Sequence, residues 1–449
     1  MRKRLLSFGM GLVLLSAAHA ESDYVYILTG QSNSLGAVKG SPATPEQLKR
    51  YESEGLLWSG NMERDSGRTF DKSPSWQKVQ PQLPEYNGSL CMGPEYGFAH
   101  MMQRRGWHSG ARIRIIKASL DGGGNSFWLP GKPAYVTLCK TINGGLAALK
   151  GKPHVQALLY LQGESDKGEE ISLAPARFEK LKANLQKEVK RGLKYAVVGQ
   201  CATWFKKDTE DDKGNTTAGL MYALAQKKKK EIGWVYTRDL SKITSGDNMG
   251  VHYDGLSQIT IGARFAYAVA TLEKLPFGFV RGDTPERPLD SGSAWWGGKL
   301  PRESDVITWD ISSCRGGDSL NKGLIVAGVR VEDPGAGKVS LAGKKSAVLK
   351  VGSKGIELKE GDLEISCRLV TAADQTWTLG DCRTLKISKL EGSGVVTVIA
   401  PPSATLELNL SSDTAQEWIL PQEMPQVKAT INGKPAEFVK QGDTYKLKS

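Results

Sequence analysis

The chain has 449 residues, with 60 Lys and Arg against 48 Asp and Glu, and a formal net charge of +12. This length exceeds what one hydrophobic core usually organises, so we expect two or more domains. The basic excess is spread along the chain. Its one dense run, residues 227–230, follows a helix-like stretch without interleaved aromatic residues, which indicates a solvated helix end and argues against a nucleic-acid partner.

The N-terminus has the pattern of a secretory signal peptide over residues 1–20. Arg2, Lys3 and Arg4 precede an apolar run, and Ala18-His19-Ala20 follows it as a small-residue cleavage site. We therefore expect export, to the periplasm or outside the cell. No later segment approaches the ~20 apolar residues of a transmembrane helix, so no membrane span is expected.

From residue 21 to about 280, short apolar runs alternate with amphipathic stretches that have helical spacing. The runs are rich in β-branched or aromatic residues and apolar on both alternating positions, as in strands covered on both faces. They lie at 24–29, 113–118, 155–162, 194–200 and 234–239. This alternation predicts an α/β domain with a parallel sheet and helices on both faces.

The composition changes after this region. Residues 281–302 are rich in proline and glycine and read as a linker. Residues 303–400 hold short alternating strands between turn residues, which favours a β-sandwich-like accessory domain. Residues 401–449 form a small β-rich tail, in which Asn432-Gly433 predicts a hairpin turn. We find no internal repeat.

The six cysteines give no sign of a metal or redox site. None lies in a CxxC or Cys/His spacing, so we expect neither a metal nor a cofactor. Export makes disulfides permissible, and Cys367 with Cys382, which flank a strand, turn and strand unit, is the first pair that we expect to be bridged.

Ligands of open parallel sheets bind beyond the carboxyl ends of the strands. Four segments with reactive residues are predicted to meet at that edge: 29–34, 119–125, 162–166 and 246–254. Each one alone has an ordinary structural explanation, such as a tight turn or a helix cap. Their common location favours a functional site.

These segments supply what acyl transfer needs. Ser32 follows a strand at a tight turn, and a serine nucleophile requires a base. His108 and His154 precede strands and His100 lies in a helical stretch, which leaves His252 as the base.

The orienting acid stays open between Glu164, Asp247 and Asp254. Candidate oxyanion donors are the Ser32 N–H, a backbone N–H of Gly122 or Gly123 in the 122–124 run, and the Gln162 amide.

At these residues the sequence resembles the SGNH hydrolases, and within them the sialate O-acetylesterase and acetylxylan esterase group of carbohydrate esterases. The resemblance covers about residues 24–275 and lies in five blocks: GQSNS (30–34), GPEYGFA (93–99), KASLDGGGNSFW (117–128), LYLQGESD (159–166) and HYDGLSQITIGARFA (252–266). It implies a flavodoxin-like three-layer α/β/α domain and metal-independent hydrolysis through an acetyl-enzyme, with Ser32 as nucleophile and His252 as base.

One departure concerns the acid. Many relatives have an aspartate three residues before the histidine, where this chain has Met249. Because other members are thought to use the glutamate of the glutamine-glycine-glutamate block, the resemblance favours Glu164, with Asp247 second.

The sequence therefore predicts a serine esterase that removes O-acetyl groups from a carbohydrate. Trp128 is expected either to stack on a sugar or to be a core or lid residue. The alternatives are a non-catalytic carbohydrate-binding protein on the same scaffold and a lipase-like or thioester hydrolase.

Overall fold

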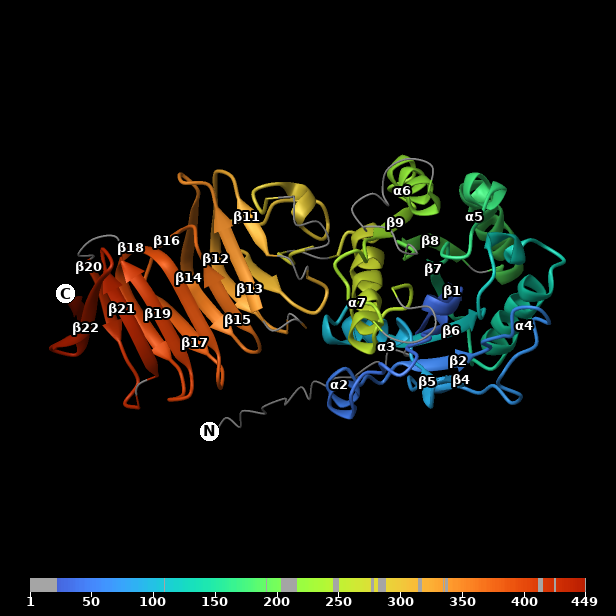
Figure 1. Cartoon of the computed structure of the whole chain (residues 1–449), viewed down its shortest axis with the longest axis horizontal. Helices are drawn as coiled ribbons and strands as arrows, with labels where there is room; N and C mark the ends of the chain where they lie inside the picture. The colour runs from blue at the N-terminus through green and yellow to red at the C-terminus, as the bar shows by residue number, and fades with distance from the viewer. Residues whose placement is uncertain are drawn as a thin grey trace, which may run out of the picture.

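The computed structural model describes residues 22–448, except 109, 191, 203–215, 245–249, 276–277, 282–287, 314–316, 334, 336–337, 411–414 and 424. The predicted signal peptide lies outside the described residues. An α/β part and a β-rich part lie end to end (Figure 1). None of the helices in the described residues has the length and apolar character needed to cross a membrane.

The α/β part is built on a seven-stranded sheet with the order β3-β2-β6-β1-β7-β8-β9, in which only the β2–β3 pair is antiparallel. The strands are β1 (Asp23–Gly30), β2 (Leu56–Ser59), β3 (Gln77–Lys78), β6 (Arg112–Ser119), β7 (His154–Leu161), β8 (Gly192–Gly199) and β9 (Ile232–Val235). Each predicted strand is present in full or in part. The short β2 and β3 were missed, because they lie in a loop-rich region without clear periodicity.

Helices cover both faces of the sheet. One face packs on α3 (Glu95–Arg104) and α7 (Gly255–Leu272), and the other on α4 (Pro133–Ala147), α5 (Glu169–Val189) and α6 (Thr217–Lys227). Alternate residues of β1 divide between the two cores, with Tyr26 in one and Ile27 in the other. The expected three-layer α/β/α fold is confirmed. The basic run 227–230 is the predicted helix end, since it begins at the last residue of α6.

Helices α3 and α7 cross closely because glycines face each other there. A Cβ on Gly97 would lie 1.8 Å from the Ile259 carbonyl oxygen, and one on Gly262 would lie 1.9 Å from that of Pro94. Shorter elements complete this part: α1 (Ser32–Leu35), α2 (Pro45–Arg50), the hairpin of β4 (Gln82–Tyr86) and β5 (Ser89–Cys91), and the 3₁₀ helix η1 (Asn125–Trp128).

The β-rich part is a parallel solenoid. Its strands are β10 (Val306–Trp309), β11 (Asp318–Leu320), β12 (Gly323–Val331), β13 (Lys338–Gly343), β14 (Val348–Leu358), β15 (Asp362–Ile365), β16 (Arg368–Thr371), β17 (Gln375–Leu379), β18 (Thr384–Ile399), β19 (Thr405–Leu410), β20 (Ala415–Ile419), β21 (Gln426–Ile431), β22 (Lys434–Gln441) and β23 (Thr444–Lys448). Leu363 pairs with Leu385, Leu385 with Leu406 and Leu406 with Val427, always in parallel, so these coils take about 21 residues each.

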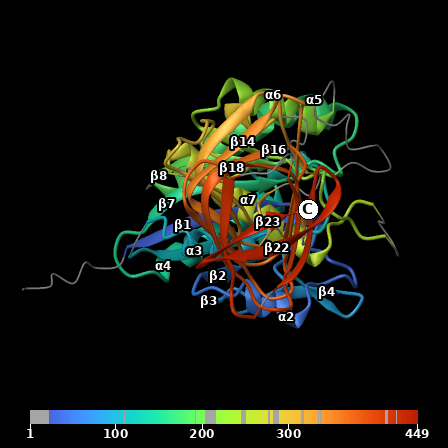
Figure 2. The ribbon, with the colours of Figure 1, turned by 90° about the vertical axis from the view of Figure 1, so that its left-hand side faces the viewer.

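The prediction of a β-sandwich over residues 303–400 is therefore wrong. A sandwich packs two antiparallel sheets, whereas each strand here pairs in parallel with a strand one coil further along the chain. Figure 2 looks along the long axis with the solenoid toward the viewer. Buried leucines stack inside it, and a 3₁₀ turn, η3 (Gly292–Ala294), precedes the first coil.

The C-terminal tail contains the predicted hairpin. Ile431 pairs antiparallel with Lys434, and both turn residues have positive φ, 51° at Asn432 and 77° at Gly433. Strands β22 and β23 pair antiparallel after the last coil. Repeat folds need such atypical terminal segments to end the stacking of coils.

The expected Cys367–Cys382 bridge is also wrong, because both thiols are free. In the parallel register, Ile365 pairs with Ile387 and Leu363 with Leu385. Cys367 therefore lies beyond one end of this strand pair and Cys382 before the other end. The first side chain is buried and the second is exposed.

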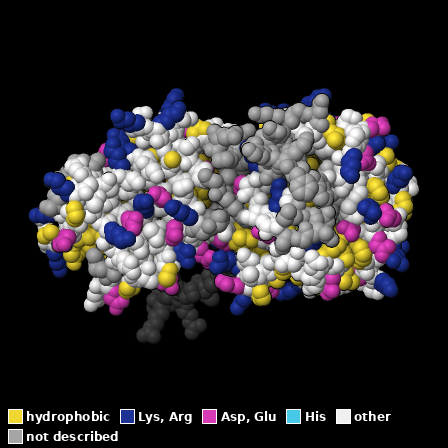
Figure 3. All heavy atoms as spheres, in the orientation of Figure 1, with side chains coloured by type: hydrophobic (Ala, Val, Ile, Leu, Met, Phe, Trp, Pro, Cys, Tyr) yellow, Lys and Arg dark blue, Asp and Glu magenta, His cyan; other side chains and the backbone are white. Residues whose placement is uncertain are grey.

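The outer surface of the solenoid carries ion pairs between neighbouring coils. Glu364 lies between Lys338 at 2.7 Å and Lys386 at 2.8 Å, and these two cations lower its pKa to about 2. On the face seen in Figure 3, both basic and acidic side chains are scattered over the solenoid, and several basic ones project along its upper edge.

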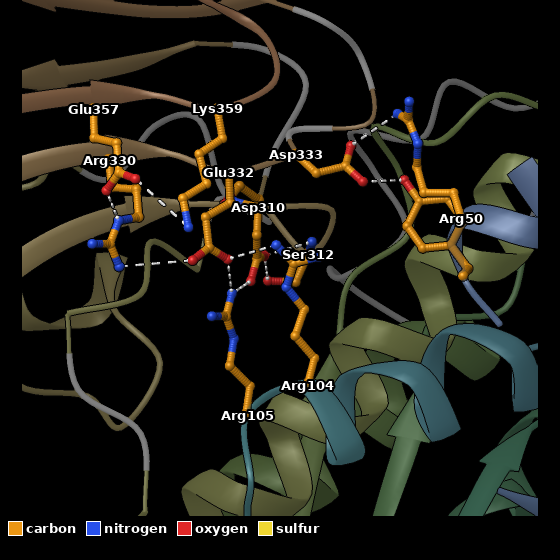
Figure 4. Close-up of polar contacts among 12 residues, drawn as sticks. Arg50, Arg104, Arg105, Asp310, Ser312, Arg330, Glu332, Asp333, Glu357 and Lys359 are labelled. Atoms are coloured by element: carbon orange, nitrogen blue, oxygen red, sulfur yellow. Dashed lines mark hydrogen bonds and ion pairs between the residues drawn. The ribbon is translucent and has the colours of Figure 1, made fainter. Parts of the chain in front are cut away.

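A buried polar network joins the two parts (Figure 4). Arg105, at the end of α3, donates to Asp310 at 2.6 Å and to Glu332 at 2.8 Å, both in the β-rich part. The Tyr267 hydroxyl of α7 also donates to Asp310, at 2.5 Å. In the described part of the predicted linker, Trp296 stacks on Tyr267 with ring centroids 5.4 Å apart.

Candidate active site

The turn after β1 presents Ser32 at the carboxyl edge of the sheet. Gly30 has φ +138°, and a Cβ there would lie 1.9 Å from the Leu161 carbonyl oxygen of β7. The Gln31 N–H donates to that same oxygen at 3.1 Å. This close contact, which only glycine permits, places Ser32 as the first residue of α1, with 5% of its surface exposed.

His252 reaches Ser32 from a loop that precedes α7. Its Nε2 lies 2.9 Å from the Ser32 Oγ, although the two residues are 220 positions apart in the chain. The loop is fixed on its other side, since the Ile243 N–H donates to the His252 carbonyl at 2.8 Å. The structure thus brings together the predicted nucleophile and base.

No described residue forms a hydrogen bond with the other ring nitrogen, Nδ1 of His252, which is buried. The expected partner Glu164 lies elsewhere: its Oε1 accepts from Asn33 Nδ2 at 2.7 Å and from the Ala202 N–H at 3.2 Å. Asp254 caps α7 by accepting the Ser257 N–H at 2.8 Å. Asp247 and Met249 lie outside the described residues. Glu164 therefore forms no hydrogen bond with the imidazole in this structure.

The environment keeps the imidazole neutral. Burial, together with the charge of Lys39, lowers the pKa of His252 to about 4. Burial also raises the pKa of Glu164 to about 6, against the opposing effect of its hydrogen bonds from Asn33 and backbone N–H groups. Neutral imidazole is the form that accepts a proton, so His252 can act as a base at neutral pH.

The predicted oxyanion donors differ in their availability. As the first residue of α1, Ser32 has a backbone N–H with no partner inside the helix. Gly122 lines the same cleft with φ +78°. Gln162 is unsuited, because its Nε2 already donates to Gln31 Oε1 at 2.8 Å and to the Gly123 carbonyl at 2.9 Å. The Gln162 amide therefore holds the rim loops together instead of facing the cleft.

Trp128 is a core residue in this structure. It is 2% exposed, and its Nε1 donates to Gln162 Oε1 at 2.9 Å. Its ring is not available to a sugar, so the expectation of sugar stacking is wrong and the alternative, a core residue, holds. The residue before it in the chain, Phe127, lines a neighbouring cavity.

Ser32 and His252 lie in a cleft of about 600 Å³. Charged and polar side chains line much of it, as recognition of a hydroxylated ligand requires. The predicted rim segments contribute Gln31, Asp121, Ser165 and Val251 to the cleft, besides Ser32, Gly122 and His252. The cleft residues to which the sequence did not point are Lys39, Glu63, Arg64, Asp65, Ser66 and Phe70. They lie between residues 36 and 70, in loops that have neither periodicity nor a recognisable motif. Among the described residues, no group of three or more His, Cys, Asp or Glu could hold a metal ion.

The three-layer fold, with serine and histidine at the carboxyl edge of a parallel sheet, defines an SGNH-type hydrolase scaffold. The family model described as "Carbohydrate esterase, sialic acid-specific acetylesterase" matches residues 22–271, more than half of the chain. The chain belongs to this carbohydrate esterase family.

Two solved structures show a distant similarity to this chain. A protein from Arabidopsis thaliana shares 17% identity over 56% of this chain and 98% of its own, with a TM-score of 0.42. A carbohydrate acetylesterase from Xanthomonas citri shares 15% identity over 55% of this chain and 56% of its own, with a TM-score of 0.38. No curated protein matches the chain significantly in sequence.

Proposed function

We propose that this protein is an exported serine esterase that removes O-acetyl groups from a carbohydrate through an acetyl-enzyme intermediate. The observation that carries the proposal is the 2.9 Å contact between Ser32 Oγ and His252 Nε2 at the wall of an open cleft. Membership of the carbohydrate esterase family supports the reaction class. The signal-peptide pattern of residues 1–20 supports export to the periplasm or outside the cell.

The proposed reaction has two steps. Ser32 Oγ attacks the acetyl carbonyl carbon while His252 Nε2 takes the hydroxyl proton, and His252 then returns it to the departing sugar oxygen. Water next attacks the acetyl-enzyme with His252 as base, which releases acetate and restores the Ser32 hydroxyl. The backbone N–H groups of Ser32 and Gly122 are the proposed oxyanion donors, each worth about 10²- to 10³-fold in rate.

Acetylated xylan, O-acetylated sialic acid or a similar glycan is the proposed substrate. The cleft offers both cations, such as Lys39 and Arg64, and acids, such as Asp121. These groups suit hydroxyl-rich sugars better than a long acyl chain.

The test compares the purified protein with Ser32→Ala on 4-nitrophenyl acetate and on a panel of acetylated glycans. We expect acetate release from at least one glycan and a loss of about 10³-fold or more in the variant. Faster turnover of long acyl esters than of acetyl esters would favour a lipase-like enzyme. Equal rates for the two proteins would refute the esterase.

The second candidate is a carbohydrate-binding protein that has kept the scaffold without catalysis. It is favoured by one observation, the buried His252 Nδ1 without a hydrogen-bond partner among the described residues. In that case both the protein and Ser32→Ala would bind an acetylated glycan with the same affinity, and neither would release acetate.

A further inference from the structure

Asn33, the neighbour of Ser32 in α1, is fully buried and does not line the cleft. Its Nδ2 donates to Glu164 Oε1 at 2.7 Å and to the Val251 carbonyl at 3.0 Å, and its Oδ1 accepts the Tyr253 N–H at 3.3 Å. Val251 and Tyr253 are the two residues on either side of His252. One side chain beside the nucleophile therefore holds the backbone on both sides of the base.

These contacts determine the orientation of the amide. Its nitrogen meets a carboxylate and a carbonyl, and its oxygen meets an N–H group. If the amide were reversed, its Oδ1 would face two acceptors, the Glu164 carboxylate and the Val251 carbonyl, and a buried site does not tolerate such unpaired contacts. Glu164, itself 7% exposed, accepts the shortest of the three bonds and so fixes which way Asn33 points.

The ring of His252 needs such a restraint from its backbone. In a serine triad, the acid orients the imidazole through Nδ1, but no described residue forms that bond here. The contacts of Asn33 with residues 251 and 253, together with the bond from Ile243 to the His252 carbonyl, hold the peptide from which the ring projects. The Ser32–His252 distance is then fixed through a direct neighbour of Ser32.

We propose that Asn33, held by Glu164, is the positioning residue that aligns His252 with Ser32, so that Glu164 serves the reaction through Asn33 and not as the acid of a triad. This inference rests on the proposed esterase function. It assigns to the glutamine-glycine-glutamate block a different role from the one expected from the sequence.

The variant Glu164→Gln separates the two roles of Glu164. A glutamine oxygen can still accept the Asn33 amide bond, so the positioning role predicts a loss of kcat of no more than about tenfold. A triad acid predicts a loss of about 10⁴-fold for the same change, because the imidazole tautomer would be wrong. A loss of that size would overturn the proposal.

Asn33→Ala and Asn33→Asp test the positioning residue itself. We expect kcat for 4-nitrophenyl acetate to fall by about 100-fold in Asn33→Ala, as for a catalytic group displaced by about 1 Å, while KM changes little. Asn33→Asp should be worse, because its carboxylate would face Glu164 and the Val251 carbonyl. Adding Glu164→Gln to Asn33→Asp should recover part of the loss, since the glutamine amide can donate to the new carboxylate.

Ser34→Ala is the matched control. Ser34 lies in the same helix and is equally buried, but its hydroxyl contacts Ser119 and not the histidine loop. The melting temperature of Ser34→Ala reports how much stability the loss of one buried hydrogen bond costs in this helix. The kcat of this variant should stay within about threefold of that of the parent protein. If Asn33→Ala and Asn33→Asp lose no more kcat than Ser34→Ala, the proposal is overturned.

A readout independent of turnover keeps this test separate from that of the esterase. The titration of His252 can be followed by NMR of its ring nitrogens, with His252→Gln to assign the signal. In the parent protein the pKa of His252 is held at about 4 by burial and Lys39. Asn33→Ala should raise it toward the ordinary value of about 6.5 as the loop opens to water. An unchanged titration would overturn the positioning role, whereas an inactive parent protein would refute only the esterase.

Discussion

Replacing Lys117 with methionine should destabilise the α/β part more than any single surface change. Lys117 lies on β6 and contacts α1, the helix that begins at Ser32. The side chains of Lys117 and of its partner Glu95 are both 0% exposed. The ammonium donates to Glu95 at 2.8 Å and to the carbonyl of Leu35, the last residue of α1, at 2.9 Å. Methionine fills a similar volume but leaves the Glu95 carboxylate buried without its cation.

Removing one partner of a buried ion pair typically costs about 3–5 kcal/mol, because the remaining charge has lost its compensation. In a domain of this size, each kcal/mol lowers the melting temperature by roughly 2–4 °C, so we expect a decrease of about 6–20 °C. Replacing both residues by Lys117→Met and Glu95→Leu removes the orphaned charge and should restore most of the stability.

The measurement is thermal or denaturant unfolding of the four proteins of this double-mutant cycle. Lys182→Met is the control, since Lys182 pairs at 3.1 Å with Glu231, whose side chain is 59% exposed, and such a pair contributes at most about 1 kcal/mol. If Lys117→Met lost no more stability than Lys182→Met, or if the double variant were as unstable as the sum of the single ones, the reasoning would be refuted.

Two further predictions concern the site. The value of kcat/KM should fall as the pH drops through about 4, because the base must be neutral and burial, with the Lys39 charge, lowers the pKa of His252 to about 4. Lys39→Gln should move this midpoint to higher pH. A midpoint above pH 6 in the parent protein would contradict the assignment of His252 as the base. The folded-state pKa lies below the unfolded value of about 6.5, so this group's contribution to stability is complete above that value and is lost as the pH falls toward 4. Trp128→Phe should lower kcat by about tenfold with KM for a glycan unchanged, because it removes the donor that holds Gln162 at 2.9 Å. A variant with the kcat of the parent protein would contradict this role.

The meeting of Ser32 and His252 could be expected from the sequence because it depends on topology. Parallel strands place all their carboxyl ends on one edge, whatever the details of side-chain packing. The orienting acid depends on much finer geometry. Glu164 is on the expected rim, yet its carboxylate bonds Asn33 at 2.7 Å instead of the imidazole. The partner of this carboxylate depends on side-chain geometry, which no pattern of residue types encodes.

The same limit applies to Gln162, a candidate oxyanion donor, and to Trp128, for which stacking on a sugar was one of two expectations. Both belong to motif blocks on the rim, but their hydrogen bond at 2.9 Å turns them toward each other and away from the cleft. Position on the rim could therefore be predicted, whereas the direction of each side chain could not. Lys39 and Arg64 had no signal at all, since the loops that carry them have no periodic pattern.

The solenoid shows why strand pairing is harder to predict than strand content. Alternating apolar and polar residues give the same pattern of period two in a sandwich and in a coil, because each strand buries one face in both. What separates the two folds is the partner of each strand, which lies one coil away in the chain. Leu363, Leu385 and Leu406 pair in neighbouring coils, so a repeat of about 21 residues is present in this part of the sequence.

The earlier coils do not keep this length. Gly323 pairs with Val348 and Gly328 with Gly355, so the number of residues per coil changes along β12. Each coil buries one apolar face, but the coils differ in length and in residue type. A search for repeated sequence therefore does not find them. They become evident only from the requirement that the next coil cover each apolar face.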